Sequence, residues 1–295
     1  MSKIVLCRPM GGLNDVLCQI ELCWRYCLDY NRKLIIDSSV SGLRDDFFNY
    51  FEPRDNGIMY EVPEWLKKII LFLFPKKKSK KEYIDRCLKL CGKAYFARYS
   101  REKRGYVNER TNKKITFRMG EWHRRIILIH HDCGGGENSI ECLKWLKFTK
   151  KVSDEITNRL SQLKKPYSAI HIRNTDYQTD YVPFFEEIAP KVAGKNLLVC
   201  SDDYACIEYA KKYFVDSHIV TVSNIPDTGG KSLHNNEDLD LYQTNLDALV
   251  DLVALSLSDE LHLCPHSLGE LSGYSKLVRN LNSQKELVWE LLDQA

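Results

Sequence analysis

The sequence predicts an α/β fold made of two doubly wound domains that face each other across a cleft. Short apolar strands alternate with helix-like segments along most of the 295 residues, and this alternation is typical of parallel sheets covered by helices. A chain of this length has room for two ordinary domains. Pro166 follows a helix-like segment and marks the expected boundary, so we expect one domain over residues 1–165 and a second over residues 166–295.

The first domain opens with a strand–loop–helix–strand unit, the building block of a parallel sheet. We expect the strands over residues 4–7 and 33–37 and the helix over residues 16–30. Gly11 and Gly12 lie in the loop after the first strand, where glycine tolerates backbone angles that other residues avoid and lets a ligand approach closely. A tight structural turn explains the two glycines equally well, because their spacing matches neither a P-loop nor a dinucleotide-binding fingerprint.

The remainder of the first domain has a less regular pattern. Residues 44–118 are rich in aromatic and basic residues and show helical character only in parts. We expect a strand over residues 125–129, followed by a loop with three consecutive glycines at 134–136, which places that loop at a strand end. A helix over residues 153–164 then leads to the domain boundary.

The second domain repeats the strand and helix alternation more clearly. We expect strands over residues 167–172, 196–200, 218–222 and 260–264, and helices over residues 183–193, 204–214 and 245–257. Polar residues follow three of these strands, namely His171, Arg173 and Asp176, then Ser201, Asp202 and Asp203, then His266 and Ser267. Because the carboxyl ends of parallel strands lie on one edge of a sheet, these groups can converge on one ligand.

The composition is that of an ordinary soluble protein, with 44% hydrophobic and 28% charged residues and a net charge of +3. The 11 cysteines lie mostly in apolar segments and include no C-x-x-C pair. We therefore expect buried thiols under reducing conditions, and no zinc site or other metal. A strand follows Met1 almost directly, and no apolar run is long enough to span a bilayer, so we expect a cytoplasmic protein.

Three side chains of the second domain suit a nucleoside diphosphate. The planar guanidinium of Arg173 matches phosphate oxygens, and Ser267, just before a helix-like segment, adds a hydroxyl and backbone N–H groups to the same anion. Asp251 lies on the expected helix over residues 245–257, where its carboxylate can accept hydrogen bonds from a base with two adjacent N–H donors, such as guanine.

Each of these assignments has a structural alternative. A surface ion pair explains Arg173 and Asp176 without any ligand, and Asp202 or Asp203 suits a helix cap at least as well as a ligand contact. A carboxylate on a helix, such as Asp251, is usually a solvated charge.

The order of these motifs resembles the donor-binding half of the fucosyltransferase superfamily. This superfamily includes the α-1,2 and α-1,6 fucosyltransferases and the rhizobial enzymes that fucosylate Nod factors. The resemblance is carried by H-I-R-N-T-D-Y (171–177), L-L-V-C-S-D-D (197–203) and D-L-V-A-L-S (251–256) followed by Ser267. At the start of the chain, P-M-G-G-L-N-D (9–15) looks like the glycine-rich loop that opens these enzymes.

The resemblance implies a GT-B fold and an inverting, metal-independent glycosyltransferase that uses a GDP-sugar as co-substrate and no other cofactor. It assigns residues 1–165 to the acceptor side and residues 166–295 to the nucleotide sugar. His171 and Arg173 would contact the diphosphate of the donor, and Asp251 would contact the guanine. The other donor-binding residues that it implies are Asp203, Ser267, Gly11, Gly12, Asn14 and Asp15.

The chain departs from the superfamily pattern at three positions. Asn174 stands where many members have a second arginine, so the leaving diphosphate has one fewer cation unless His131, Lys231 or a residue of the first domain compensates. Tyr177 and Tyr181 stand where the α-1,6 members have a lysine and a glutamate.

Inverting transfer needs a base for the acceptor hydroxyl and a cation for the departing diphosphate. Arg173 is the expected cation. Asp180 is the carboxylate nearest to the missing glutamate and is a candidate base, while Asp176, Asp15 and Glu137 compete with it.

Residues 62–104 form a basic and aromatic insertion in the first domain. The apolar segment 62–75 contains Trp65 and runs into K-K-K-S-K-K at 76–81, a combination that suits an anionic bilayer surface. A buried helix followed by a solvated run of charge is the alternative. No nucleic-acid-binding motif accompanies the charge, so we expect no nucleic acid partner.

The sequence therefore predicts a glycosyltransferase that moves a sugar, most simply L-fucose from GDP-fucose, to a hydroxyl of a glycan or lipid-linked glycan in bacterial surface polysaccharide synthesis. With residues 62–81 on lipid, the enzyme would lie on the inner face of the cell membrane. Two alternatives remain, an enzyme that uses another nucleotide-sugar donor and a non-catalytic nucleotide- or glycan-binding protein on the same fold.

Overall fold

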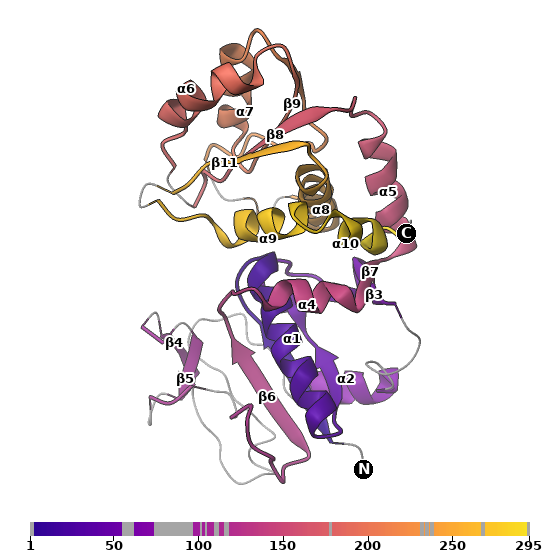
Figure 1. Cartoon of the computed structure of the whole chain (residues 1–295). Coiled ribbons are helices and arrows are strands. Elements are labelled where there is room, and N and C mark those ends of the chain that lie inside the picture. Colours follow the sequence, from indigo (N-terminus) through magenta and orange to yellow (C-terminus); the bar gives the residue numbers. More distant parts are fainter. Residues whose placement is uncertain are drawn as a thin grey trace. The chain divides into compact units, whose positions relative to one another are not determined.

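The computed structural model divides the chain into two compact units, each with its own sheet (Figure 1). The first unit comprises Met1–Ser41 and Pro53–Cys142, and the second comprises Gly42–Glu52 and Leu143–Ala295. The structure describes residues 3–54, 62–73, 97–100, 102–103, 105–108, 112–114, 118–176, 179–230, 233, 236, 239–266 and 269–293.

The first unit has a mixed sheet with the strand order β2-β1-β6-β5-β4. The parallel strands are β1 (Ile4–Pro9), β2 (Lys33–Ile36) and β6 (Ile127–Asp132), and the antiparallel strands are β4 (Ala97–Ser100) and β5 (Gly105–Asn108). All six residues of β1 are buried, as expected for a parallel strand that is covered on both faces.

The helices of the first unit are α1 (Leu13–Asp29), α2 (Glu64–Leu73) and α4 (Asn138–Lys144), which ends two residues beyond the unit boundary. The buried side of α1 carries Val16, Ile20, Cys23 and Cys27, and this three- and four-residue spacing is the one that an amphipathic helix requires.

β6 starts and ends later than the sequence predicted. It covers Ile127–Asp132 rather than residues 125–129, because His131 and Asp132 still pair with Arg8 and Pro9 of β1. His130 and His131 are therefore buried strand residues, and not part of the loop that follows.

The second unit has a parallel sheet with the strand order β10-β9-β8-β11. Its strands lie within two residues of the predicted ranges and are β8 (Tyr167–Ile172), β9 (Asn196–Ser201), β10 (His218–Val220) and β11 (Glu260–Leu263). Its helices are α5 (Lys150–Leu160), α6 (Tyr181–Val192), α7 (Tyr204–Tyr213), α8 (Leu241–Ser256), α9 (Gly273–Asn282) and α10 (Lys285–Leu291). The helix-like segment expected after Ser267 corresponds to α9, although no bounds were predicted for it, and α10 was not predicted.

The division between the units differs from the expected boundary at residues 165 and 166. α5 packs on α8 of the second unit, where Arg159 pairs with Asp247. The segment Gly42–Glu52 also belongs to this unit, because Asn245 of α8 donates hydrogen bonds to the carbonyl of Leu43 and to the Tyr50 hydroxyl, both at 2.9 Å. The short strands β3 (Phe51–Pro53) and β7 (Leu146–Phe148) pair beside this contact.

Each sheet has a point at which the strand order reverses. In the first unit, β2 lies on one side of β1 and β6 lies on the other. In the second unit, β9 and β10 follow β8 in one direction, and β11 lies on its opposite side. Ligands of doubly wound sheets bind outside the carboxyl ends of the strands at such points, so the loops after β1 and β6 and the loops after β8 and β11 are the places to examine.

The described residues include nine cysteines with free thiols, of which eight are buried and Cys133 is half-buried. The expectation of buried thiols is confirmed for those eight. Within the same part of the chain, no group of three or more His, Cys, Asp or Glu side chains is placed to hold a metal ion. None of the described helices is both long enough and apolar enough to cross a membrane.

Candidate functional site

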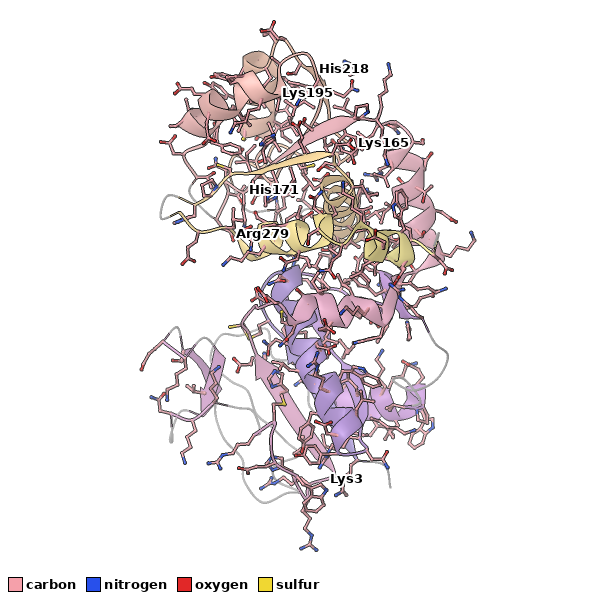
Figure 2. The ribbon with its side chains drawn as sticks, viewed as in Figure 1. Lys3, Lys165, His171, Lys195, His218 and Arg279 are labelled. Carbon is pink, nitrogen blue, oxygen red and sulfur yellow. The ribbon has the colours of Figure 1, made fainter. Side chains whose placement is uncertain are left out.

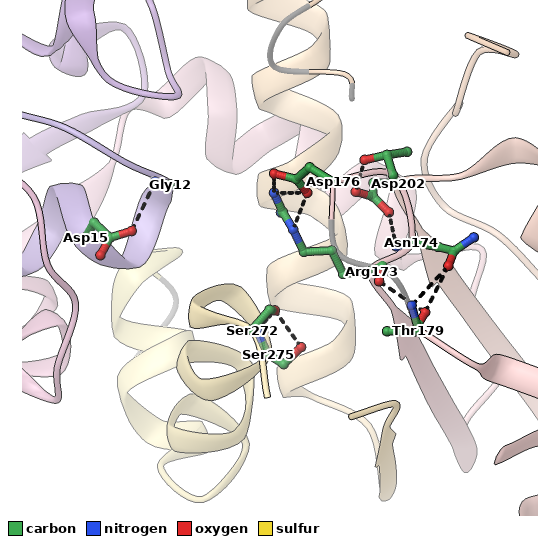
Figure 3. A network of polar contacts seen from close by, with 10 residues as sticks. Gly12, Asp15, Arg173, Asn174, Asp176, Thr179, Asp202, Ser272 and Ser275 are labelled. Atoms are coloured by element: carbon green, nitrogen blue, oxygen red, sulfur yellow. Dashed lines mark hydrogen bonds and ion pairs between the residues drawn. The ribbon is translucent and has the colours of Figure 1, made fainter. Parts of the chain in front are cut away.

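The loop that follows β8 carries Arg173, whose guanidinium holds the Asp176 carboxylate with two hydrogen bonds (Figure 3). Nε donates to Oδ1 at 2.9 Å and Nη2 donates to Oδ2 at 2.8 Å. The Arg173 side chain is 27% exposed and that of Asp176 is 36% exposed. The ion pair foreseen as the structural alternative is therefore present, and the binding of phosphate by Arg173 stays a prediction.

His171 lies at the carboxyl end of β8 and is buried beside the start of α9 (Figure 2). Its Nδ1 lies 3.0 Å from the Ser275 hydroxyl, and its ring lies against that of Tyr274. Burial, reinforced by the positive charge of Arg173, lowers the pKa of His171 to about 3. The imidazole is therefore neutral at physiological pH, and the contact of His171 with the donor diphosphate stays a prediction.

The start of α9 adds two serines that the sequence analysis did not single out. Ser272 caps the helix by accepting a hydrogen bond from the Ser275 N–H at 3.1 Å, and the two hydroxyls lie 2.8 Å apart (Figure 3). The S-x-x-S spacing before the apolar residues of α9 was the available signal for this cap. Ser267, the predicted phosphate ligand in the preceding loop, lies outside the described residues.

Asp251 is a buried residue of α8, so its interpretation as a solvated charge is wrong. Its Oδ2 accepts a hydrogen bond from the Ser223 hydroxyl at 2.9 Å, and the buried Cys200 thiol, a weak donor, also interacts with the carboxyl. Within the described part of the chain, Oδ1 accepts no hydrogen bond from an N–H or O–H group. Burial raises the pKa of Asp251 to about 7. A buried carboxyl with an oxygen that lacks a donor is suited to a ligand that brings N–H groups.

Asp202 and Asp203, after β9, hold local structure. Asp203 caps α7 by accepting a hydrogen bond from the Ala205 N–H at 3.0 Å, which confirms the helix-cap interpretation. Its second oxygen accepts a hydrogen bond from the Asn174 side chain at 2.7 Å, and Asp202 accepts one from the Asn174 N–H at 2.8 Å. The structure thus places Asp203 next to the β8 loop, where a role in shaping the site stays a prediction.

Asp180 is exposed at the start of α6, and it makes no side-chain capping bond to that helix. Its charge contributes to the raised pKa of Cys264, which is caused first by burial, so Asp180 lies near the end of β11. Of the two candidate bases on this loop, Asp176 is held by Arg173, whereas Asp180 stands at the carboxyl edge of the sheet without that ion pair.

In the first unit, the glycine-rich loops are packed tightly around the start of α1. Gly11 has a φ of +91°, and the Gly12 N–H donates to Asp15 Oδ2 at 3.2 Å. A side chain at Gly135 would place its Cβ 2.7 Å from the Asn14 amide nitrogen. This geometry confirms the tight-turn interpretation of the glycines, and any contact of these residues with the donor stays a prediction.

Buried hydrogen-bonded side chains also hold the loop that follows β6. His130 Nε2 lies 2.7 Å from Gln19 Oε1, and the Gln19 side-chain nitrogen donates to the Gly134 carbonyl at 2.6 Å. Burial lowers the pKa of His130 to about 4. Nearby in the sheet, the buried Arg8 donates to Asp37 at 2.8 Å. These pairs could not be predicted from the sequence, because their members lie far apart in the chain.

Neither a protein-family model nor a curated protein sequence matches this chain. Among solved structures, it is similar to NodZ α-1,6-fucosyltransferase soaked with GDP-fucose, with a TM-score of 0.55 and 14% identity over 95% of this chain and 93% of NodZ. A second structure of NodZ, from Bradyrhizobium, gives the same TM-score and identity over 95% of this chain and 94% of NodZ. The apo form of POFUT1 aligns with a TM-score of 0.52 and 13% identity over 96% of this chain and 95% of POFUT1.

At such identities the similarity concerns the fold. Both NodZ and POFUT1 align over nearly the whole chain. The expectation of a GT-B, fucosyltransferase-like α/β fold is therefore confirmed.

Proposed function

We propose that the protein is an inverting glycosyltransferase that moves L-fucose from GDP-fucose to a glycan hydroxyl. The observation that carries the proposal is the set of groups in the second unit. Arg173 and Asp180 follow β8, and Asp251 is buried with one oxygen that meets no N–H or O–H donor among the described residues. The similarity in fold to NodZ, whose structure was determined after soaking with GDP-fucose, supports the choice of donor.

Donor binding follows from the chemistry of these side chains. Arg173 exchanges Asp176 for the diphosphate, because its planar fork suits phosphate as well as carboxylate. Ionised Asp251 accepts hydrogen bonds from the guanine N1–H and 2-amino groups, which satisfies the oxygen that has no donor among the described residues. Uracil has no such pair of adjacent donors, so this carboxylate favours GDP over UDP.

In the transfer step, Asp180 removes the proton of the acceptor hydroxyl as that oxygen attacks the anomeric carbon of fucose. The bond from that carbon to the diphosphate oxygen breaks, and the electron pair leaves with GDP. Arg173 stabilises the charge that develops on the diphosphate. Asp180 is the proposed base because it is exposed at the start of α6 and makes no capping bond to that helix, and a base must be free to reach the proton that it takes. Asp176, which the diphosphate displaces from Arg173, is the competing candidate.

The test is a thermal-shift comparison of GDP, UDP and ADP, followed by assays with GDP-fucose. Selective stabilisation by GDP, which adds about 2.7 kcal/mol at 100 times its Kd, together with release of GDP from GDP-fucose on transfer, supports the proposal. Stabilisation by UDP instead would point to another donor. Selective binding of GDP without hydrolysis or transfer would make the protein a non-catalytic binder.

We propose in addition that α2 rests on an anionic membrane surface, where the acceptor is a lipid-linked glycan. Ile70 of this helix is 1% exposed and packs with Ile4, Leu6 and Ile35. Its opposite side exposes large apolar groups at helical spacing, with Trp65 62%, Ile69 46% and Phe72 78% exposed. The expectation of a buried helix thus holds for one side of α2 only.

Charge complementarity favours lipid as the occupant of that side. Lys68 is exposed on α2, and the sequence continues into the lysine cluster at 76–81, whose structure lies outside the described residues. Aromatic and aliphatic side chains beside lysines bind the interface of anionic bilayers, with about 1 kcal/mol contributed per basic residue near the surface.

Co-sedimentation with vesicles tests this second proposal. The double variant Trp65→Ser, Phe72→Ser should lose binding to vesicles that contain anionic lipid, and a variant with the lysine cluster neutralised should lose it as well. Trp122→Ser is the matched control, because Trp122 is 56% exposed elsewhere on the first unit. Equal partitioning of the wild type and the α2 variant would overturn the proposal.

A further inference from the structure

Asn174, which stands where many members of the fucosyltransferase superfamily have a second arginine, is tied into the second unit by four hydrogen bonds. Figure 3 shows its contacts with Thr179 and Asp202. Its side-chain nitrogen donates to Asp203 at 2.7 Å, and its backbone N–H donates to Asp202 at 2.8 Å. Its side-chain oxygen lies 3.1 Å from the Thr179 hydroxyl and accepts from the Thr179 N–H at 3.3 Å. We call Asn174, Thr175, Thr179, Asp202 and Asp203 the Asn174 network.

The side chain of Asn174 uses both its donor and its acceptor. An amide carries an NH₂ group and an oxygen, whereas the guanidinium of arginine carries donors only. An arginine at this position has no group that accepts the Thr179 N–H and hydroxyl. Asn174 therefore makes contacts that an arginine cannot reproduce, and it is more than the loss of a cation.

The Asn174 network joins the loop after β8 to the loop after β9. Thr175 donates to Asp202 at 2.5 Å, so Asp202 holds two successive residues of the β8 loop. Asp203 is itself fixed by its capping bond to α7. The Thr179 hydroxyl also lies 3.2 Å from the carbonyl of Arg173, which places the network directly on the backbone of that arginine.

We propose that Asn174 is a positioning residue that fixes the backbone of Arg173 for binding the donor diphosphate. This inference rests on the proposed function of the same site. Asn174 need not touch the ligand, because it acts by fixing the position of the loop after β8 against the loop after β9. The chain thus has one phosphate-binding arginine in this motif, held by an amide in place of a second cation.

The test compares three substitutions at position 174 by GDP calorimetry and steady-state kinetics with GDP-fucose. Asn174→Ala removes the side-chain contacts and should raise the Kd for GDP by about tenfold or more, since small displacements at an active site have effects of that size. Asn174→Asp keeps the acceptor for Thr179 but places a carboxylate against Asp203, and should also weaken binding. Asn174→Arg should weaken binding as well, although it adds a cation.

A double variant separates positioning from a general loss of stability. If Asn174 acts through Arg173, Asn174→Ala should have little further effect on the Kd for GDP in an Arg173→Ala background. Asn196→Ala is the matched control, because Asn196 also donates two side-chain hydrogen bonds, to Lys164 and Pro166, at the amino end of β9. It should leave both the Kd and kcat within about twofold of the wild type.

Several results would overturn the inference. Tighter GDP binding by Asn174→Arg would show that the position lacks only a cation, and an equal loss of affinity with and without Arg173 would show a purely structural role. Should Asn174→Ala fail to fold, Asn174→Asp and Thr179→Val provide the same comparison. Failure of the wild type to bind GDP selectively would instead overturn the proposed function, so the two failures are distinguishable.

Discussion

Arg173 carries more of the proposed chemistry than any other residue of the second unit. Its guanidinium is held in the planar geometry that a diphosphate needs. Arg173→Ala removes a cation that interacts most strongly with the charge of the transition state, so it should raise the barrier by about 3 kcal/mol and lower kcat roughly a hundredfold. Steady-state turnover of GDP-fucose measures this effect.

Arg279→Ala is the charge-matched control for that variant. Arg279 is exposed in the last turn of α9, within the same unit. It should leave turnover unchanged, and both variants should melt near the temperature of the wild type. Near-normal turnover by Arg173→Ala would remove this arginine from the mechanism.

The protonation of Asp251 links nucleotide binding to pH. Its pKa is raised by burial from an ordinary value of 3.8 to about 7, so the folded state holds this proton more tightly than the unfolded state does. The stabilisation is fully present below pH 3.8 and is lost as the pH rises through about 7. Guanine needs the ionised carboxylate, so GDP affinity should change in the opposite direction and rise with pH over the same range.

Asp251→Asn should remove that pH dependence and change the preferred base. The new amide would place an NH₂ group against the 2-amino group of guanine, whereas xanthine has a carbonyl oxygen there and can accept the bond. Calorimetry at about pH 6 and about pH 8, on either side of the shifted pKa, should show weaker GDP binding and stronger binding of xanthosine diphosphate than in the wild type. Unchanged affinities for both nucleotides would place the guanine elsewhere.

At the scale of elements, the loop after β6 is fitted closely against the start of α1. Gly135→Ala would bring a Cβ to within 2.7 Å of the Asn14 amide nitrogen. Such overpacking costs about 1–3 kcal/mol of folding free energy, and denaturant unfolding measures it. Gly136→Ala is the neighbouring control, because its added Cβ meets nothing within 4 Å, and it should stay within about 0.5 kcal/mol of the wild type. Equal stabilities would show that the two loops are less tightly packed than this geometry indicates.

The strands of the second unit were predictable because each is a short apolar run that ends at a polar residue. β8 was predicted over its full range, Tyr167–Ile172. The assignment of Gly42–Glu52 to the second unit was not predicted. It depends on a hydrogen bond from Asn245 to the carbonyl of Leu43, and these two residues are 202 positions apart in the chain. Local patterns locate an element, but contacts between distant residues decide which unit it joins.

The same difference applies to the candidate site. Arg173 and Asp251 were predicted from residue type and from the strand or helix that carries them, and Asp180 from its closeness to the glutamate that the resemblance leads one to expect. The cap formed by Ser272 and Ser275 and the network around Asn174 escaped notice, because small polar side chains acquire their role only when another loop supplies their partners. Sequence reasoning therefore treated Asn174 as a missing charge, whereas the structure shows four hydrogen bonds.

At the scale of the whole molecule, each compact unit has its own sheet and its own reversal of strand order. Hydrogen exchange of the full chain, with and without GDP, distinguishes their roles. The loops after β8 and β9 and the start of α9 should exchange more slowly with GDP, because bound groups open less often. Protection at residues 10–15 as well would support the predicted contact of Gly11, Gly12, Asn14 and Asp15 with the donor. Protection confined to the first unit would contradict the assignment of the nucleotide to the second.

Because Arg173 is paired with Asp176, an anion from solution must displace that carboxylate before it can bind the guanidinium. Asp176 is tethered three residues from the guanidinium, so its carboxylate competes at the high effective concentration of an intramolecular partner. Free phosphate and other small anions have no such tether and displace it poorly. A nucleotide whose base is already held gains the same intramolecular advantage for its own phosphates. Arg173 therefore binds the phosphates of a nucleotide whose base is already bound in preference to free phosphate.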